Sequence, residues 1–199
     1  MLKPHQCQSL TFRPTTEAVA SVWLRVVQAR HSADDSIIVN STIVGFYYEK
    51  IYRIEYLIML NESWEAYYCF VKSQFNDEIK ELELEKDQNK WSLNGKYNDS
   101  FDGCTDVDIP LTPFTNSLPI NRLKLSLGQE ENIDIIYIDL FEDTIKHVKQ
   151  KYRRISSEVY KYENVPNDFE AEIKVDSEGF VIDYPQLFTR TYSVASNYR

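Results

Sequence analysis

The sequence predicts an all-β fold with little helix. Runs rich in Val, Ile, Tyr and Phe recur along the chain, apolar and polar residues alternate within many of them, and short polar joints separate them. We count about eleven such runs, each of strand length. A sheet of this size must close into a barrel, or stack as a sandwich, to protect its edges.

The first half of the chain has the pattern of an antiparallel meander. Residues 17–29 would also fit a helix, and their Val content favours a strand. Leu82 and Leu84 alternate with glutamates, which is typical of a half-solvated strand. The predicted strands of this half are residues 17–29, 36–48, 51–60, 64–75, 78–86 and 91–95, with a polar turn at 31–35.

The second half continues in the same way after a central polar stretch, residues 102–127. The clearest alternation lies in 168–176, where every second side chain is apolar and predicted to face the core. The predicted strands of this half are residues 122–127, 133–141, 144–155, 157–165, 168–176 and 180–184.

Length and charge limit the architecture and the partners. A chain of 199 residues has the size of one domain. We expect an N-terminal arm at residues 1–14, a single β domain at 15–192 and a C-terminal tail at 193–199. The net charge of −9 repels phosphate backbones, so we expect no nucleic-acid partner. The oligomeric state stays open.

The cysteines and the apolar runs predict a cytoplasmic protein. Cys7, Cys69 and Cys104 are odd in number, and their spacing fits neither a disulfide framework nor a metal site. Residues 1–14 lack the apolar core of a secretory signal. No apolar run reaches about 18 residues, so we expect no integral membrane segment.

The central stretch contains three acids within seven residues, Asp102, Asp106 and Asp108. A glycine after the first acid and Pro113 at the twelfth position exclude the calcium-loop pattern. Asp106 and Asp108 share one face of a strand and could form a general acid–base pair. Alternatively, both carboxylates accept hydrogen bonds from turn amides and stabilise the loop.

Further polar residues could line a site, or could be structural. Asn116 lies in a polar turn, where its amide could stabilise the turn or line a pocket. Arg122, Tyr152, Arg153, Asp183 and Arg190 could form a polar cluster, or could be surface charges with one internal Arg–Asp pair. No catalytic, phosphate-binding or dinucleotide motif is present, so we expect no catalytic residue, no metal and no cofactor.

The segment DGCTDVDIPLTPFTNSLPINRLKL, residues 102–125, resembles the core motif of the "putative glycolipid-binding" family. Phe101 stands where the family usually has Leu, and Asn121 replaces the first arginine of its Arg-Arg pair, whereas Arg122 keeps the second. Trp91–Gly95, the Gln150-Lys-Tyr152 motif and the block from Val175 to Pro185 extend the resemblance, which covers about residues 20–190.

The resemblance implies a spiral β-roll, an incomplete antiparallel barrel around a cavity, and by analogy of shape a lipid carrier. The first hypothesis is therefore a non-enzymatic protein that holds a glycolipid or other lipid-like ligand inside the roll, with acyl chains in an apolar cavity. The residues expected at its mouth are Asp106, Asp108, Asn116, Arg122, Tyr152 and Asp183. One alternative is a small hydrolase or isomerase that acts on a sugar or lipid head group through Asp106 and Asp108, and another is a structural interaction module.

Overall fold

All strands belong to one open sheet. The computed structural model describes residues 5–14, 19–30, 35–47 and 49–198. In these residues fifteen strands follow the order β8-β7-β6-β5-β4-β3-β2-β1-β15-β14-β13-β12-β11-β10-β9. Neighbours pair antiparallel, except that β9 pairs parallel with β10. Because β8 and β9 are the two free ends, the sheet is an incomplete barrel, and the predicted all-β class is confirmed.

The N-terminal half supplies eight strands. They are β1 (His5–Pro14), β2 (Val19–Arg30), β3 (Asp35–Tyr47), β4 (Lys50–Asn61), β5 (Ala66–Phe75), β6 (Glu78–Asp87), β7 (Lys90–Leu93) and β8 (Lys96–Tyr97).

The rest of the chain adds seven strands and three short helical segments. They are η1 (Asp99–Phe101), β9 (Asp106–Asp108), η2 (Pro113–Asn116), α1 (Ser117–Leu123), β10 (Glu130–Asp139), β11 (Thr144–Arg154), β12 (Val159–Val165), β13 (Glu170–Val175), β14 (Val181–Tyr184) and β15 (Phe188–Tyr198). Neither α1 nor any other described helix has the length and apolar character needed to cross a membrane.

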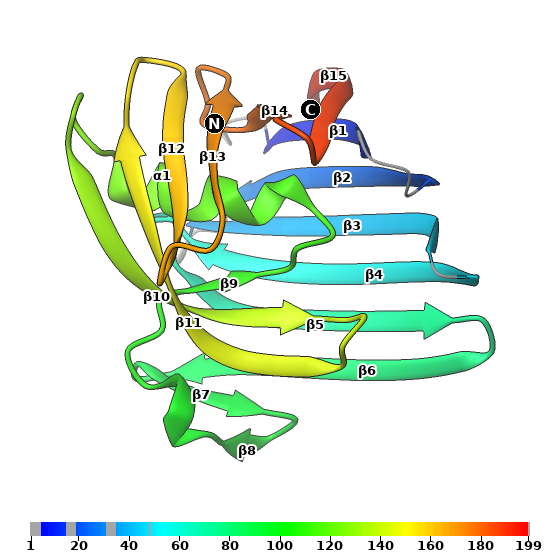
Figure 1. The fold of residues 1–199 in the computed structure, drawn as a ribbon. Coiled ribbons are helices and arrows are strands. Elements are labelled where there is room, and N and C mark those ends of the chain that lie inside the picture. The colour runs from blue at the N-terminus through cyan, green and yellow to red at the C-terminus, as the bar shows by residue number, and fades with distance from the viewer. Residues whose placement is uncertain (1–4, 15–18, 31–34, 48, 199) are drawn as a thin grey trace.

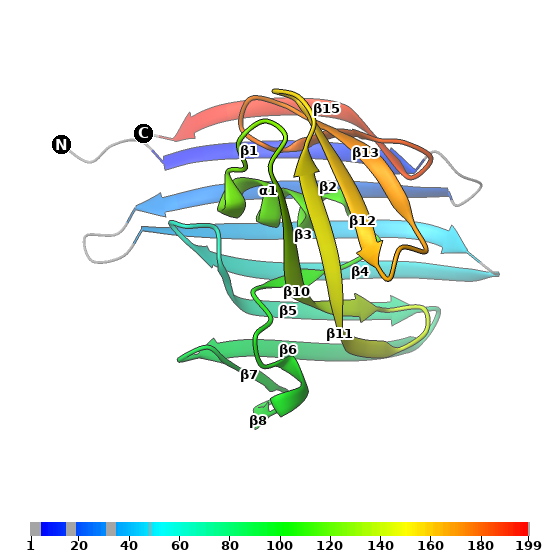
Figure 2. The same ribbon diagram turned by 60° about the vertical axis from the view of Figure 1, so that its left-hand side comes forward.

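The sheet folds back on itself, so that its two halves face each other. The strands β1 to β6 form a back layer, and β10 to β12 cross in front of it (Figure 1). A turned view shows the same crossing, with α1 between the two layers (Figure 2). The core lies in this space, and the inward faces of both layers are buried there.

Alternation along the strands decides which side chains enter the core. In β4 every second residue from Tyr52 to Leu60 is buried, as predicted. Leu82 and Leu84 of β6 are buried between exposed glutamates. The predicted strand at residues 17–29 is confirmed as β2, within its described part. The predicted turn at 31–35 lies mostly outside the described residues.

The terminal segments differ from the prediction. Residues 5–14, predicted as part of an arm, form β1, and residues 193–198, predicted as a tail, belong to β15. The two strands pair with each other along their whole length, and β1 also pairs with β2. Each obtains its hydrogen bonds from a partner far away in the sequence, which a local pattern does not show. These two strands and the very short β8 and β9 are the four of the fifteen described strands that the sequence did not predict.

The predicted strand at residues 122–127 is also wrong. Helix α1 runs to Leu123, and Lys124 ends it in the left-handed conformation with φ of 47°. Pro119 is accommodated in the first turn of the helix, where its missing N–H is not needed. The alternating leucines at 123, 125 and 127 therefore do not share a face, and Leu127 is 72% exposed.

Candidate functional site

Strand β9 places two carboxyl groups inside the protein. Its entry is held by the buried Trp91, whose Nε1 donates to the Cys104 carbonyl at 3.0 Å. Parallel pairing with β10 then aligns Asp106 with Ile135 and Asp108 with Tyr137. Both acids are buried, and their spacing puts them on one face of the strand, as the sequence predicted.

Asp106 forms a buried ion pair with Arg122 of α1. The Nη2 and Nε groups of Arg122 donate to Asp106 Oδ2 at 2.6 and 3.2 Å, and Thr105 Oγ1 also donates to this oxygen at 3.1 Å. The two side chains are only 2% and 14% exposed. Burial raises the pKa of the Asp106 carboxyl, and the Arg122 guanidinium partly offsets this increase. The pair thus fixes α1 against β9.

Asp108 belongs to a closed ring of hydrogen bonds, which we call the polar ring. Thr115 Oγ1 and Gln150 Nε2 donate to its two oxygens at 2.6 and 2.7 Å. Tyr152 donates its hydroxyl to Gln150 Oε1 at 3.4 Å and accepts from Asn116 Nδ2 at 2.9 Å. Since Thr115 and Asn116 are adjacent in η2, the ring closes through the backbone. It ties η2 to β9 and β11.

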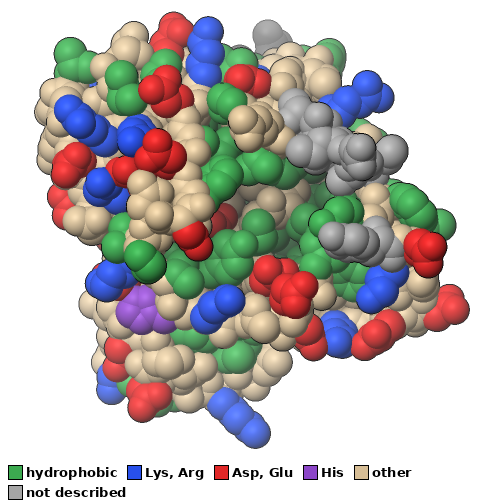
Figure 3. Space-filling model, viewed as in Figure 1, with side chains coloured by type: hydrophobic (Ala, Val, Ile, Leu, Met, Phe, Trp, Pro, Cys, Tyr) green, Lys and Arg blue, Asp and Glu red, His purple; other side chains and the backbone are tan. Residues whose placement is uncertain are grey.

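A pocket of about 210 Å³, here called the interior pocket, opens beside the polar ring. It is lined by Asp108, Pro110, Thr112, Asn116, Tyr137, Tyr162, Asn164, Phe169, Tyr184, Leu187 and Phe188. The surface is hollowed between the C-terminal strands and the N-terminal layer, and hydrophobic side chains surround the hollow (Figure 3). The lining combines one carboxyl group, two amides, one threonine and three tyrosines with apolar side chains.

Burial sets the protonation of these groups. It raises the pKa of the Asp108 carboxyl, against the hydrogen bonds from Thr115 and Gln150, which lower it. Burial also raises the pKa of Tyr137 to about 12, and raises that of Tyr162 and Tyr184. The tyrosine hydroxyls therefore stay neutral and can donate. Among the described residues, no hydrogen bond joins the hydroxyl of Tyr137 or Tyr184 to a partner.

Five of the six predicted site residues lie together. Asp106 and Arg122 form the ion pair, and Asp108, Asn116 and Tyr152 belong to the polar ring. Within the described residues both acids accept hydrogen bonds from side chains and not from turn amides, so the predicted donors are wrong, whereas Asp108 does stabilise the loop through Thr115, as that alternative expected.

Asp183 is separate from this group. It lies on β14, and its Oδ1 accepts from Thr189 Oγ1 at 2.8 Å in an exposed bond, while the next residue, Tyr184, faces the interior pocket. Two arginines that were predicted to join Arg122 and Tyr152 in a polar cluster also lie apart from them. Arg190 pairs with Asp176 at 2.6 Å, and Arg153 is exposed.

The site residues predicted from the sequence did not include Gln150, Thr115 or the tyrosines of the interior pocket, although Gln150 stands in one of the motifs that carry the family resemblance. One signal for Gln150 was available, since it stands two residues before Tyr152 on the same face of a strand. Among the described residues, no three His, Cys, Asp or Glu side chains are grouped so that they could hold a metal ion.

Comparison with known proteins places the chain beside proteins of the same shape. A model of the family described as Putative glycolipid-binding matches residues 16–190. The structure is similar to that of a DUF1089 family protein from Pseudomonas aeruginosa, with a TM-score of 0.75, 29% identity, and coverage of 89% of this chain and 94% of that one. A comparison with curated proteins found no match.

A second solved structure shows the fold at greater distance. It is a β-barrel-like protein of the domain of unknown function DUF1849 from Brucella abortus, with a TM-score of 0.54 and 12% identity. The likeness covers 100% of this chain and 99% of that one, and it concerns the fold alone.

Proposed function

The chain belongs to the family described as Putative glycolipid-binding, and we propose that it is a non-enzymatic protein that holds a glycolipid by its sugar head group in the interior pocket. One observation carries the proposal. A buried carboxyl group, Asp108, lines a pocket together with tyrosine hydroxyls that have no described partner. The Tyr137 and Tyr184 hydroxyls are accessible from the pocket and have no described partner, so they can bond to a ligand rich in hydroxyl groups.

The size of the interior pocket supports a head group rather than a whole lipid. At about 210 Å³ the pocket is smaller than the roughly 300–1,000 Å³ of pockets that enclose a drug-sized ligand, so it suits a small head group. Phe169 and Phe188 offer apolar surface to the C–H groups of a sugar, and Asp108 and Asn116 offer polar partners. The acyl chains, which we expected inside the roll, would then lie outside this pocket.

Binding is favoured over the alternative of a hydrolase or isomerase. The usual two-carboxylate mechanism needs both acids at the substrate. Asp108 lines the interior pocket, whereas Asp106 does not and is held by Arg122 through several hydrogen bonds. This arrangement leaves only the Asp108 carboxyl group to face a ligand. That group can accept a hydrogen bond from the ligand.

The test compares two detergents with the same chain. Octyl glucoside carries a sugar head group, whereas octyl tetraethylene glycol does not, and calorimetric titration below their micelle concentrations measures binding of each. We expect the glucoside to bind more tightly. Equal affinities would show that the sugar is not recognised and would refute the proposal. Release of free glucose during incubation, followed by mass spectrometry, would contradict the non-enzymatic part.

A conservative variant locates the binding. Tyr184→Phe removes a hydroxyl that has no described partner, so folding should be unaffected while glucoside affinity falls about 2- to 12-fold, the effect of one hydrogen bond. Tyr97→Phe is the control outside the pocket, because Tyr97 is exposed on β8 and its hydroxyl donates only to the exposed Asp102. Equal glucoside affinity in the two variants would exclude the interior pocket as the site.

A further inference from the structure

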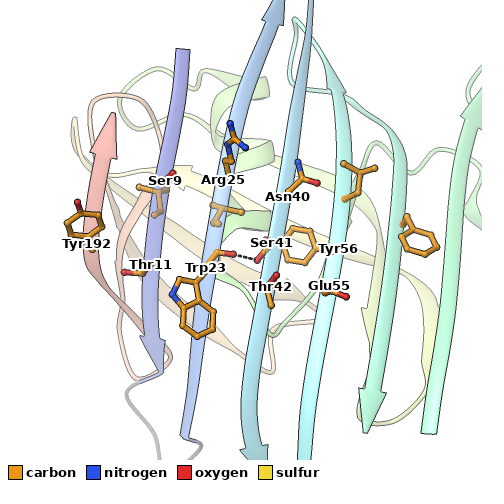
Figure 4. A pocket seen from close by; sticks show the side chains of 14 residues that line it. Ser9, Thr11, Trp23, Arg25, Asn40, Ser41, Thr42, Glu55, Tyr56 and Tyr192 are labelled. Atoms are coloured by element: carbon orange, nitrogen blue, oxygen red, sulfur yellow. Dashed lines mark hydrogen bonds between the residues drawn. The ribbon is translucent and has the colours of Figure 1, made fainter. Parts of the chain in front are cut away.

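A second groove lies on the outward face of the N-terminal layer. In β2 the side chains of Val22 and Leu24 are buried in the core, while Trp23 between them is 50% exposed on the other side of the sheet. A groove of about 640 Å³ surrounds Trp23, with Asn40 and Thr42 from β3 and Tyr192 from β15 (Figure 4). We call it the outer groove. It is separated from the interior pocket by the sheet itself.

The strand register places aromatic side chains at intervals across the outer groove. Tyr192 is aligned with Thr11, which is aligned with Trp23. Two residues before Thr42 on β3, Asn40 is aligned with Leu57 of β4, and Leu57 is aligned with Phe70 of β5. From β15 to β5 there are five strand spacings of about 4.8 Å, so the groove extends over about 24 Å along the sheet.

Short polar side chains lie between the aromatic ones. Ser9, Thr11, Asn40 and Thr42 line the same groove and carry hydroxyl or amide groups. Figure 4 shows these polar side chains beside the indole of Trp23. Among the described residues no hydrogen bond joins the Trp23 indole N–H or the Tyr192 hydroxyl to a partner. Both can therefore donate to a ligand that lies along the groove.

The charges favour a neutral ligand. The groove contains one cationic and one anionic side chain, Arg25 and Glu55, on a protein with a net charge of −9. A polyanion such as a nucleic acid or an acidic glycan would be repelled. An acyl chain would remain largely in water in so open a groove and would gain little from burial.

We propose that the outer groove binds a neutral, unbranched oligosaccharide. Sugar rings have apolar C–H faces that pack on exposed indole and phenol rings, and hydroxyl groups that bond to short polar side chains. The alternation of aromatic and polar side chains across the groove offers both kinds of contact to successive rings. The site is distinct from the interior pocket and does not depend on the function proposed for that pocket.

Tryptophan fluorescence gives a direct test. Trp91 is fully buried and Trp64 is partly buried, so Trp23 is the most exposed of the three indoles. The full-length protein is titrated with cellohexaose, maltohexaose and chitohexaose up to about 5 mM, which covers weak affinities. We expect at least one to give a saturable blue shift and to protect Trp23 from acrylamide quenching. If none of the three binds, the proposal is wrong.

Variants test whether the hexasaccharide binds in the outer groove. Calorimetry measures affinity wherever Trp23 is replaced, because the fluorescence signal is then lost. Trp23→Ala should weaken binding about 10-fold or more. Thr42→Arg places a long charged side chain in the groove beside Trp23 and should do the same in a protein that keeps the indole. Tyr97→Phe, on the exposed strand β8 and outside both sites, should leave hexasaccharide affinity unchanged. Binding that survives Trp23→Ala and Thr42→Arg would overturn the proposal, whatever the outcome for octyl glucoside.

A second copy of the chain is the competing occupant of the same face. Sedimentation velocity over a range of protein concentrations distinguishes the two. A dimer that Trp23→Ala converts to monomers would identify the groove as a self-association surface and overturn the oligosaccharide proposal. A sedimentation coefficient unaffected by Trp23→Ala, together with hexasaccharide binding in the wild type, supports it.

Discussion

Replacing Arg122 by methionine should destabilise the protein strongly. Methionine keeps much of the apolar volume of the arginine stem but leaves Asp106, which is 2% exposed, without its cation. Removing one partner of a buried ion pair costs about 3–5 kcal/mol, because the remaining charge is buried without compensation. For a protein of this length, each kcal/mol corresponds to roughly 2–4 °C, so the melting temperature should fall by about 6–20 °C.

The loss should depend on pH in a defined direction. Burial raises the folded-state pKa of Asp106 above its ordinary value of 3.8, and without Arg122 it rises further. Between the unfolded and folded values, the folded variant binds more protons than the unfolded chain, so its stability falls as pH rises through this window. The deficit of R122M relative to wild type should therefore be largest at neutral pH and should shrink as pH falls toward 3.8.

Urea unfolding at neutral and at acidic pH measures both effects. Arg53→Met is the matched control, because its ion pair with Glu55 is exposed and should contribute only about 0–1 kcal/mol. The double variant D106L/R122M removes both charges and should recover much of the loss. An R122M deficit as small as that of R53M, or one that does not change with pH, would refute the reasoning.

Three further predictions concern the core. In G45A the new methyl carbon would lie 2.4 Å from the Tyr52 ring, which crosses this glycine. Thermal unfolding should therefore show a loss of about 1–3 kcal/mol in the free energy of unfolding. Replacing Tyr52 by leucine in the same chain should reduce that loss. Burial raises the pKa of the Cys69 thiol to about 12, so at pH 8 a thiol reagent should modify it only on unfolding; rapid labelling in peptide mass maps would contradict this. Tyr152→Phe removes the acceptor of the Asn116 amide and should cost about 1–3 kcal/mol in urea unfolding, and an unchanged midpoint would argue against the polar ring.

The strands that sequence analysis predicted most directly are those whose two faces differ. Residues 51–60 and 168–176 alternate because one face of each strand enters the core and the other meets water. This asymmetry is present in the local sequence, so it could be read without knowing the partner strands. The very short β9 carries no such pattern, since all three of its residues are buried.

The site was predicted where its residues are close in sequence. Asp106, Asp108, Asn116 and Arg122 come from one continuous motif, and the spacing of the two acids already put them on one strand face. The prediction that Asp183 belongs to the site is wrong, because adjacent residues of a strand point to opposite sides. Its neighbour Tyr184 faces the interior pocket instead.

The sequence by itself determined the all-β class, the inward faces of the long strands and most of the polar residues that gather beneath η2. Only the tertiary structure decided that residues 5–14 pair with 188–198, that Gln150 links Asp108 to Tyr152, and that Trp23 stands exposed over an outer groove. The physical reason is that local alternation records whether a side chain meets water or the core. It does not record which distant strand supplies the hydrogen bonds, and that choice brings separate segments together.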